Sequence, residues 1–190
     1  PLEGIRYRGF TLPEVLEKLP KPKGAEMPYV EGLFFLLLTG EIPSQKEVDE
    51  LMVTFRNRRV VPQYVCDVID SFPSESHPMA ILSAAVMSLQ RESHFNIKYK
   101  EGMSKMDYWD ATYEDAINLM AKMPLIGAYS YNKLYKPKKG HKNPNPSLDL
   151  GGNFAYMMGK DSPYDEVSRM YFIIHADHES GNVSAHTGHL

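Results

Sequence analysis

Apolar residues recur at helical spacing along most of the chain. Residues 11–19 open with Thr-Leu-Pro-Glu, a capping box with proline in the first turn, and their leucines and valine share one helical face. Residues 44–55 open with a second capping box, Ser-Gln-Lys-Glu, and continue with apolar residues at i, i+3, i+4 and i+7. Both patterns predict amphipathic helices. The apolar stripe of the second consists of Val48, Leu51, Met52 and Phe55.

Three further segments have helical patterns of other kinds. Residues 28–39 are apolar on nearly every side, which predicts a buried core helix, and Gly40 suits the left-handed position that follows a helix. Residues 60–72 predict another helix. Residues 108–135 predict a long helix that Pro124 should kink or break, because proline removes a backbone donor and clashes with the preceding turn.

A helix that opens at His77 is rich in small residues. Small side chains allow two helix backbones to approach closely. This face therefore predicts one of two arrangements: contact with a neighbouring helix or a symmetry mate in an oligomer, or a tight helix crossing within the chain. The small residues are Ala80, Ser83, Ala84 and Ala85.

The last apolar stripe leads into a cluster of histidines. Residues 148–158 predict a short helix or turn, and residues 162–165 predict the start of a longer helix with a buried stripe. If that helix continues, His178 falls on the same stripe, where a buried imidazole needs hydrogen-bond partners or a ligand. The stripe consists of Val167, Met170, Tyr171 and Ile174.

Four of the seven histidines lie in residues 175–190. Gly181 allows the chain to turn, and Asn182 suits the N-cap of a following helix. Free backbone N–H groups beside imidazoles predict a site for a small anion, either a carboxylate or a phosphate. Two alternatives stay open. Zinc could be held by histidines with Asp177 or Glu179, although the spacing matches no common zinc motif, or the imidazoles only cap helix carbonyls.

Two segments lack helical periodicity. Residues 136–146 are rich in lysine, asparagine and proline, which predicts a solvent-exposed basic loop, with binding of a polyanion as the alternative. Residues 5–10 predict a strand that is at most half of a short β-hairpin. The fold class predicted from the whole pattern is all-α and multi-helical.

Composition excludes several classes of protein. A net charge of −3 argues against a nucleic-acid binder, and the apolar run 33–39 is far shorter than the roughly 20 residues of a membrane-spanning helix. We therefore expect no nucleic acid and no membrane as partner. The single cysteine, Cys66, excludes a disulfide within the chain and suits a reducing compartment. A chain of 190 residues predicts one well-buried core.

Residues 175–189 read His-Ala-Asp-His-Glu-Ser-Gly-Asn-Val-Ser-Ala-His-Thr-Gly-His and closely resemble the central signature of eukaryotic, mitochondrial-type citrate synthases. The resemblance implies an all-α homodimer, with large and small domains, that condenses acetyl-CoA with oxaloacetate in the tricarboxylic acid cycle and needs no cofactor and no metal. Residues 1–190 would form the N-terminal part of the large domain only. Other segments that carry the resemblance are 3–10, 31–43, 72–79, 82–85 and 108–109.

The resemblance also implies roles for five residues. His178 matches the histidine that binds oxaloacetate in the large domain, Asn182 matches a residue lining the same pocket, and His175 lies nearby. Ser184 matches the serine that supports the catalytic acid histidine. Lys105 falls where the family commonly has an arginine that reaches the CoA phosphate of the partner subunit; lysine keeps the charge but loses the bidentate fork.

The resemblance places the catalytic residues outside this sequence. The two catalytic histidines, the catalytic aspartate and the carboxylate-clamping arginines are expected beyond Leu190, so we expect the chain alone to be inactive. The nearest alternative enzyme is 2-methylcitrate synthase, which uses propionyl-CoA. An alternative of another class is a non-catalytic helical dimerisation module. The resemblance implies the mitochondrial matrix, with the cytoplasm as the alternative location.

Overall fold

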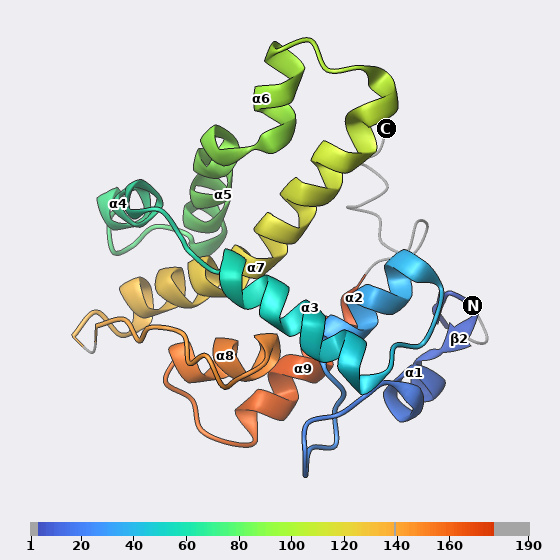
Figure 1. Ribbon diagram of the computed structural model, residues 1–190. Coiled ribbons are helices and arrows are strands. Elements are labelled where there is room, and N and C mark those ends of the chain that lie inside the picture. The colour runs from blue at the N-terminus through green and yellow to red at the C-terminus, as the bar shows by residue number, and fades with distance from the viewer. Residues whose placement is uncertain (1–3, 139, 177–190) are drawn as a thin grey trace. The chain divides into compact units, whose positions relative to one another are not determined.

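Figure 1 shows the computed structural model, which describes residues 4–138 and 140–176. The regular structure of these residues is helical apart from one short hairpin, which confirms the predicted all-α class. They divide into two compact units, each described here by itself. Each unit has its own cluster of buried apolar side chains, where the sequence predicted a single core. Of the described residues, unit 1 comprises 4–52, 147–155 and 161–176, and unit 2 comprises 53–138, 140–146 and 156–160.

Unit 1 begins with a short hairpin, in which residues 6–11 form both strands, where the sequence predicted a single strand over 5–10. Strands β1 (Arg6–Tyr7) and β2 (Phe10–Thr11) pair antiparallel, and helix α1 (Leu12–Lys18) follows directly. The predicted capping box is present: the Thr11 hydroxyl accepts from the backbone N–H of Glu14, whose carboxylate accepts from the backbone N–H of Thr11 at 2.7 Å. The hydrogen bonds that the Thr11 backbone N–H and hydroxyl donate to the Glu14 carboxylate lower the pKa of Glu14. All of these contacts are within four residues, so local sequence determines where the helix starts.

Helix α2 (Val30–Thr39) supplies the centre of the unit 1 core. Leu33 and Leu36 are almost fully buried, and Gly40 ends the helix with φ of +84°, as predicted. Leu38 is 48% exposed, so the helix is a core helix on one face only. The buried apolar cluster of unit 1 consists of Tyr7, Val15, Leu19, Leu33, Leu36 and Ile173.

Helix α3 (Gln45–Arg58) begins in unit 1 and ends in unit 2. Its capping box is also present, because the Glu47 carboxylate accepts from both the backbone N–H and the hydroxyl of Ser44. The predicted stripe is correct at its two ends, since Val48 and Phe55 are fully buried. Local capping and periodicity were therefore enough to place this helix.

Helix α9 (Tyr164–Ile174) is correctly placed, but its predicted buried face is wrong. Ser168, Arg169 and Ile173 are the buried residues of this helix. The reason is that the Arg169 guanidinium faces the interior, where carboxylates neutralise it. Hydrophobic periodicity alone predicts that a charged residue such as Arg169 lies on the exposed face. The predicted stripe is exposed at all four positions, with Val167 at 43%, Met170 at 38%, Tyr171 at 56% and Ile174 at 39%.

Unit 2 is built around one long helix, α7 (Tyr108–Tyr135). Helices α4 (Gln63–Ser71) and α5 (Pro78–Ser88) pack against it, and α6 (His94–Lys100) lies beside it (Figure 1). Two short 3₁₀ turns, η1 (Leu89–Glu92) and η2 (Lys105–Asp107), connect these helices. The buried apolar cluster of unit 2 consists of Val65, Ile69, Ile81, Ala85, Leu89 and Ile126.

Pro124 does not break α7. The helix continues through it for 28 residues and changes direction near its middle, as Figure 1 shows. The sequence left open whether this proline would kink or break the helix, and a kink is the outcome. Because the helix is continuous, residues on both of its halves belong to one element of unit 2.

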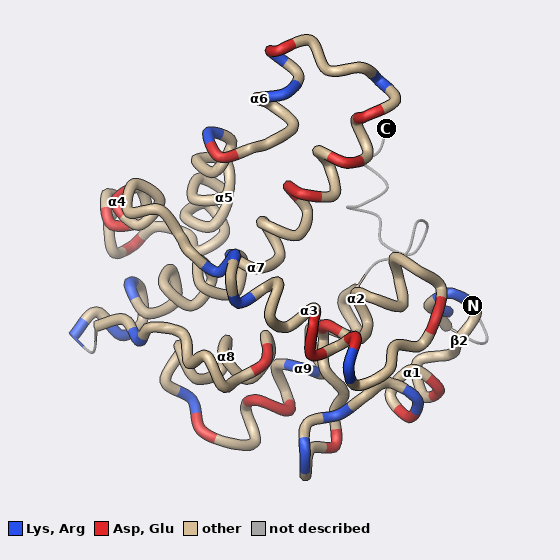
Figure 2. The backbone as a smooth tube through the Cα atoms, viewed as in Figure 1, with Lys and Arg blue, Asp and Glu red and all other residues tan. Residues whose placement is uncertain are grey.

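Figure 2 shows acidic residues recurring along the N-terminal half of α7. Each of these carboxylates has a partner within unit 2, so the stripe connects α7 to its neighbours rather than forming a free acidic surface. Asp115 accepts from two backbone N–H groups at the start of α6. The side-chain pairs are Asp110 with Lys98, Glu114 with Arg58, and Asp115 with Ser93.

The small-residue face of α5 is divided between the interior and the surface. Ala85 is fully buried where α5 packs in the core of unit 2, which fits the predicted crossing within the chain. Ala80 and Ser83 are exposed. Met79 and Met87 flank them and are 57% and 73% exposed, so this face remains apolar and uncovered in a single chain.

Candidate functional site

The candidate site begins at the C-terminal end of α9. His175 is the C-cap of this helix, and its backbone N–H donates to the carbonyl of Tyr171 at 3.1 Å. The imidazole Nδ1 lies 2.9 Å from that same carbonyl oxygen, and the ring stacks on the Tyr171 ring with 3.9 Å between centroids. His175 is exposed. It therefore stands at the surface of unit 1, directly before the segment that carries the other predicted site residues.

The helical register proposed for His178 is wrong. The prediction required the helix to continue to position 178, but α9 ends at Ile174. It also required the stripe of Val167, Met170, Tyr171 and Ile174 to be buried, and all four side chains are exposed. His178, Asn182 and Ser184 lie outside the described residues. Their assigned roles stay predictions that rest on the resemblance.

Tyr7 holds the end of α9 in place. Its hydroxyl lies 2.9 Å from the carbonyl oxygen of Ile173 and 3.0 Å from that of Ala176, and it can donate its single proton to either. Tyr7 is fully buried. Carbonyls in the last turn of a helix lack intrahelical partners, so this hydroxyl satisfies groups that would otherwise be orphaned. This role could not be predicted from the sequence, because Tyr7 and Ile173 are 166 residues apart.

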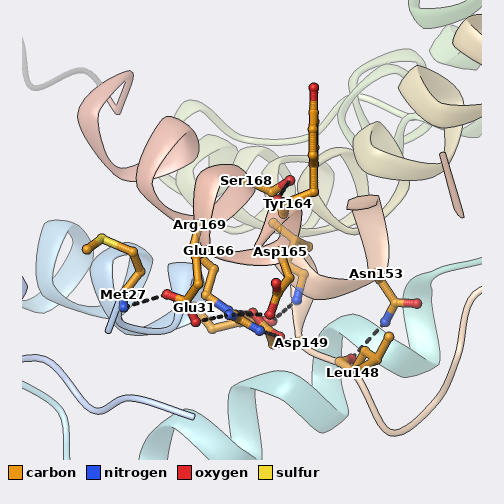
Figure 3. Close-up of polar contacts among 11 residues, drawn as sticks. Met27, Glu31, Leu148, Asp149, Asn153, Tyr164, Asp165, Glu166, Ser168 and Arg169 are labelled. Atoms are coloured by element: carbon orange, nitrogen blue, oxygen red, sulfur yellow. Dashed lines mark hydrogen bonds and ion pairs between the residues drawn. The ribbon is translucent and has the colours of Figure 1, made fainter. Parts of the chain in front are cut away.

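Arg169 fixes the first half of the same helix (Figure 3). Its Nε and Nη2 each donate to one carboxylate oxygen of Asp149, both at 2.9 Å, which makes a bidentate pair. Its Nη1 donates to Asp165 at 3.0 Å and to Glu166 at 2.9 Å. Burial alone would lower the pKa of Arg169, but the hydrogen bonds that it donates to Asp149 and Asp165 raise it above its ordinary value. The guanidinium is therefore permanently charged.

Two carboxylates extend the network to the backbone of other elements, as Figure 3 shows. Glu166 accepts from the backbone N–H of Met27 at 2.7 Å. Glu31 on α2 accepts from the backbone N–H of Leu150, the first residue of α8 (Leu150–Met157), at 2.8 Å. The starts of α8 and α9 are thereby tied to α2 and to the loop before it.

Two adjacent glycines allow α8 to approach α9. A Cβ atom at Gly151 would lie 2.6 Å from the Cγ atom of Arg169 and 3.1 Å from its backbone nitrogen. A Cβ atom at Gly152 would lie 2.7 Å from a carboxylate oxygen of Asp149. These distances are too short for a real side chain, so the ion pair occupies space that only glycine leaves.

Lys105 belongs to unit 2, whereas His175 belongs to unit 1. Lys105 is the first residue of η2 and is exposed, with Ser104 capping the turn through its hydroxyl. Its side chain makes no hydrogen bond or ion pair with any residue of 4–138 or 140–176. The charge is therefore available to an anion, but nothing in unit 2 orients it.

The described residues contain neither a metal-binding cluster nor a membrane-spanning helix. Within residues 4–138 and 140–176 no three His, Cys, Asp or Glu side chains are grouped closely enough to hold a metal ion. Among the helices of the same residues, none has the length and apolar character needed to cross a membrane.

Comparisons with known proteins agree with the resemblance. The model of the family described as "Citrate synthase, C-terminal domain" matches residues 2–190. The mitochondrial citrate synthase of Daucus carota is 47% identical over 191 residues, which cover 100% of this chain and 40% of that protein. The probable mitochondrial citrate synthase of Glossina morsitans morsitans is 45% identical over 189 residues, which cover 99% of this chain and 41% of that protein.

A solved structure gives the same result. The citrate synthase from Pyrobaculum aerophilum matches 91% of this chain and 41% of its own chain with a TM-score of 0.73 and 28% sequence identity. The chain thus spans about 40% of the length of the curated relatives it matches. Since the family model covers almost every residue and the fold agrees, this chain belongs to the citrate synthase family.

Proposed function

We propose that this chain supplies the oxaloacetate-binding side of an enzyme that condenses acetyl-CoA with oxaloacetate to give citrate and CoA. One observation carries the proposal. The segment that resembles the family signature begins at His175, where α9 ends and where the Tyr7 hydroxyl and the Arg169 network fix that helix. A binding segment that leaves a rigid helix end starts from a defined position, which lowers the entropy cost of binding.

The resemblance implies a role in this chemistry for each predicted residue. A base removes a proton from the acetyl methyl group, and that carbon then bonds to the ketone carbon of oxaloacetate, whose oxygen gains negative charge and takes up a proton. Water then cleaves the thioester, which releases citrate and CoA. His178 would donate a hydrogen bond to oxaloacetate, with Asn182 and His175 beside it. Ser184 would hold the catalytic acid histidine in position. Lys105 would attract the CoA phosphate as a point charge.

A homodimer is part of the proposal. Its support is the uncovered face of α5, where exposed methionines flank Ala80 and Ser83. Small residues between apolar ones allow close helix packing across a two-fold axis. Sedimentation of the chain and of Met87→Glu tests it: the charged variant should dissociate at a concentration at which the parent chain is dimeric. Equal dissociation of the two proteins would argue against this face.

Mitochondrial localisation is proposed on the names of the relatives, which are mitochondrial citrate synthases. The matrix is the compartment that the tricarboxylic acid cycle requires. The single cysteine suits that reducing compartment. Import of the tagged protein into isolated mitochondria, followed by protease protection, tests the assignment.

A chimera tests the proposed activity. In it, residues 1–190 replace the matching segment of the Daucus carota enzyme, which is of almost equal length. The chimera should release CoA from acetyl-CoA only when oxaloacetate is present, and propionyl-CoA in its place distinguishes a 2-methylcitrate synthase. A folded, dimeric chimera that releases no CoA from either substrate would contradict the proposal.

A further inference from the structure

Unit 2 contains a cavity of about 350 Å³ that the proposed function does not use. It is bounded by α4, the C-terminal half of α7 and the loop after α7. Its floor is apolar and includes Ile126, Ala128 and Met157, which are almost fully buried. Ligand sites typically combine an apolar cavity of this size with a few polar groups at one side.

The polar side of the cavity is positively charged. Its charged groups are Arg59, which is only 7% exposed, and Lys142. His141 also lines it, but burial lowers the pKa of its imidazole and so favours the neutral ring. No aspartate or glutamate is among the described residues that line it. Asp70 of α4 accepts a hydrogen bond from the Tyr129 hydroxyl at 2.8 Å. A desolvated positive charge beside an apolar floor favours an anion that also has an apolar part.

The basic loop is held against the cavity. The His141 ring stacks on the Tyr129 ring with 3.5 Å between centroids, and Tyr129 is itself fixed by its bond to Asp70. The Lys142 ammonium lies over the Tyr156 ring, 4.7 Å from its centroid. The Lys142 ammonium and the His141 ring are therefore placed before a ligand arrives, which reduces the entropy cost of binding.

We propose that this cavity binds a small organic anion with an apolar body, its carboxylate held between Arg59 and Lys142 and its body lying on the floor around Ile126. The volume has room for an aromatic ring with its carboxylate. Of the residues predicted to contact oxaloacetate or CoA, the two that the structure describes, His175 and Lys105, do not line it, so this proposal is tested separately from the proposed function.

Cys66 makes the test specific to this cavity. It lines the cavity and is the only cysteine of the chain, so its alkylation rate reports access to this one place. Burial raises the pKa of the Cys66 thiol, which keeps the reaction slow enough to follow. The probe is benzoate, and benzamide is its neutral counterpart of the same shape. The 190-residue chain is alkylated with iodoacetamide at a pH of about 8 in the presence of each.

The expected result is protection by the anion alone. With a dissociation constant of about 1 mM, a benzoate concentration of about 10 mM would slow alkylation about tenfold, whereas benzamide would leave the rate unchanged. Lys142→Met should reduce the protection, and Lys138→Met, an exposed lysine of the same loop outside the cavity, should not. Equal protection by both probes, protection by neither, or full protection of Lys142→Met would overturn the proposal. Circular dichroism of the variants verifies that each is folded.

Discussion

Arg169 and Asp149 form a bidentate ion pair inside unit 1, with side chains only 5% and 3% exposed. The pair lies between α8 and α9 and determines which face of α9 points inward. A buried pair of this kind costs a great deal to break, because the remaining charge stays desolvated.

Arg169→Met should destabilise the chain by about 3–5 kcal/mol, because Asp149 is left as an unpaired buried carboxylate. Urea denaturation followed by circular dichroism measures the free energy of unfolding. The double variant Arg169→Met with Asp149→Leu should recover part of the loss, since neither charge then remains buried. Additive losses in the two single variants would show that the residues are not coupled.

Tyr7→Phe should cost about 1 kcal/mol, since it removes the hydroxyl that contacts the carbonyls of Ile173 and Ala176 while it keeps the buried ring. Amide hydrogen exchange should also become faster in the last turn of α9 than in α1. The control is Tyr171→Phe, whose ring is 56% exposed. An unchanged exchange pattern in Tyr7→Phe would mean that the hydroxyl does not fix the helix end.

Two helical glycines should respond to alanine with opposite signs. Gly151→Ala should destabilise by about 1–3 kcal/mol, because the new Cβ would overlap Arg169. Gly32→Ala meets its nearest atoms at 3.6 Å, which is ordinary contact, so it should stabilise α2 by up to about 1 kcal/mol through helix propensity. Thermal unfolding of both variants measures the difference, and equal shifts of the two midpoints would refute the close approach of α8 and α9.

Acid should weaken unit 2 through Glu114. The hydrogen bond from Arg58 lowers the pKa of this carboxyl below its ordinary value of 4.5. A carboxyl whose pKa is lower in the folded state contributes stability that is complete above the unfolded value and is lost as the pH falls through the folded value. Urea midpoints measured at decreasing pH below 4.5 should therefore fall less steeply in Glu114→Gln than in the parent chain. Parallel curves would remove Glu114 as a source of acid sensitivity.

The sequence was most informative where the determinants are local. Both capping boxes, at Thr11 and Ser44, and the left-handed Gly40 lie within four residues of the atoms they contact, so the helix ends were predictable. The long helix α7 was equally clear, because its apolar period persists over many turns.

Contacts between distant residues could not be predicted in the same way. The inner face of α9 depends on Asp149 neutralising Arg169 from 20 residues away, and Tyr7 meets the end of that helix across most of the chain. A prediction from hydrophobic periodicity places a charged residue on the exposed face of a helix unless its buried partner is known. For this reason the predicted buried face of α9 was wrong. The adjacent glycines at 151 and 152 are the feature of the sequence that fits the close approach of α8 to α9.

Calorimetric titration of oxaloacetate into the chimera with the Daucus carota enzyme tests the central claim most directly. His178→Ala should weaken oxaloacetate binding at least about tenfold, because it removes a hydrogen bond to a charged ligand. The matched variant His175→Ala should have a smaller effect, since that ring is exposed and already stacked on Tyr171. An oxaloacetate affinity that His178→Ala leaves unchanged would contradict the account.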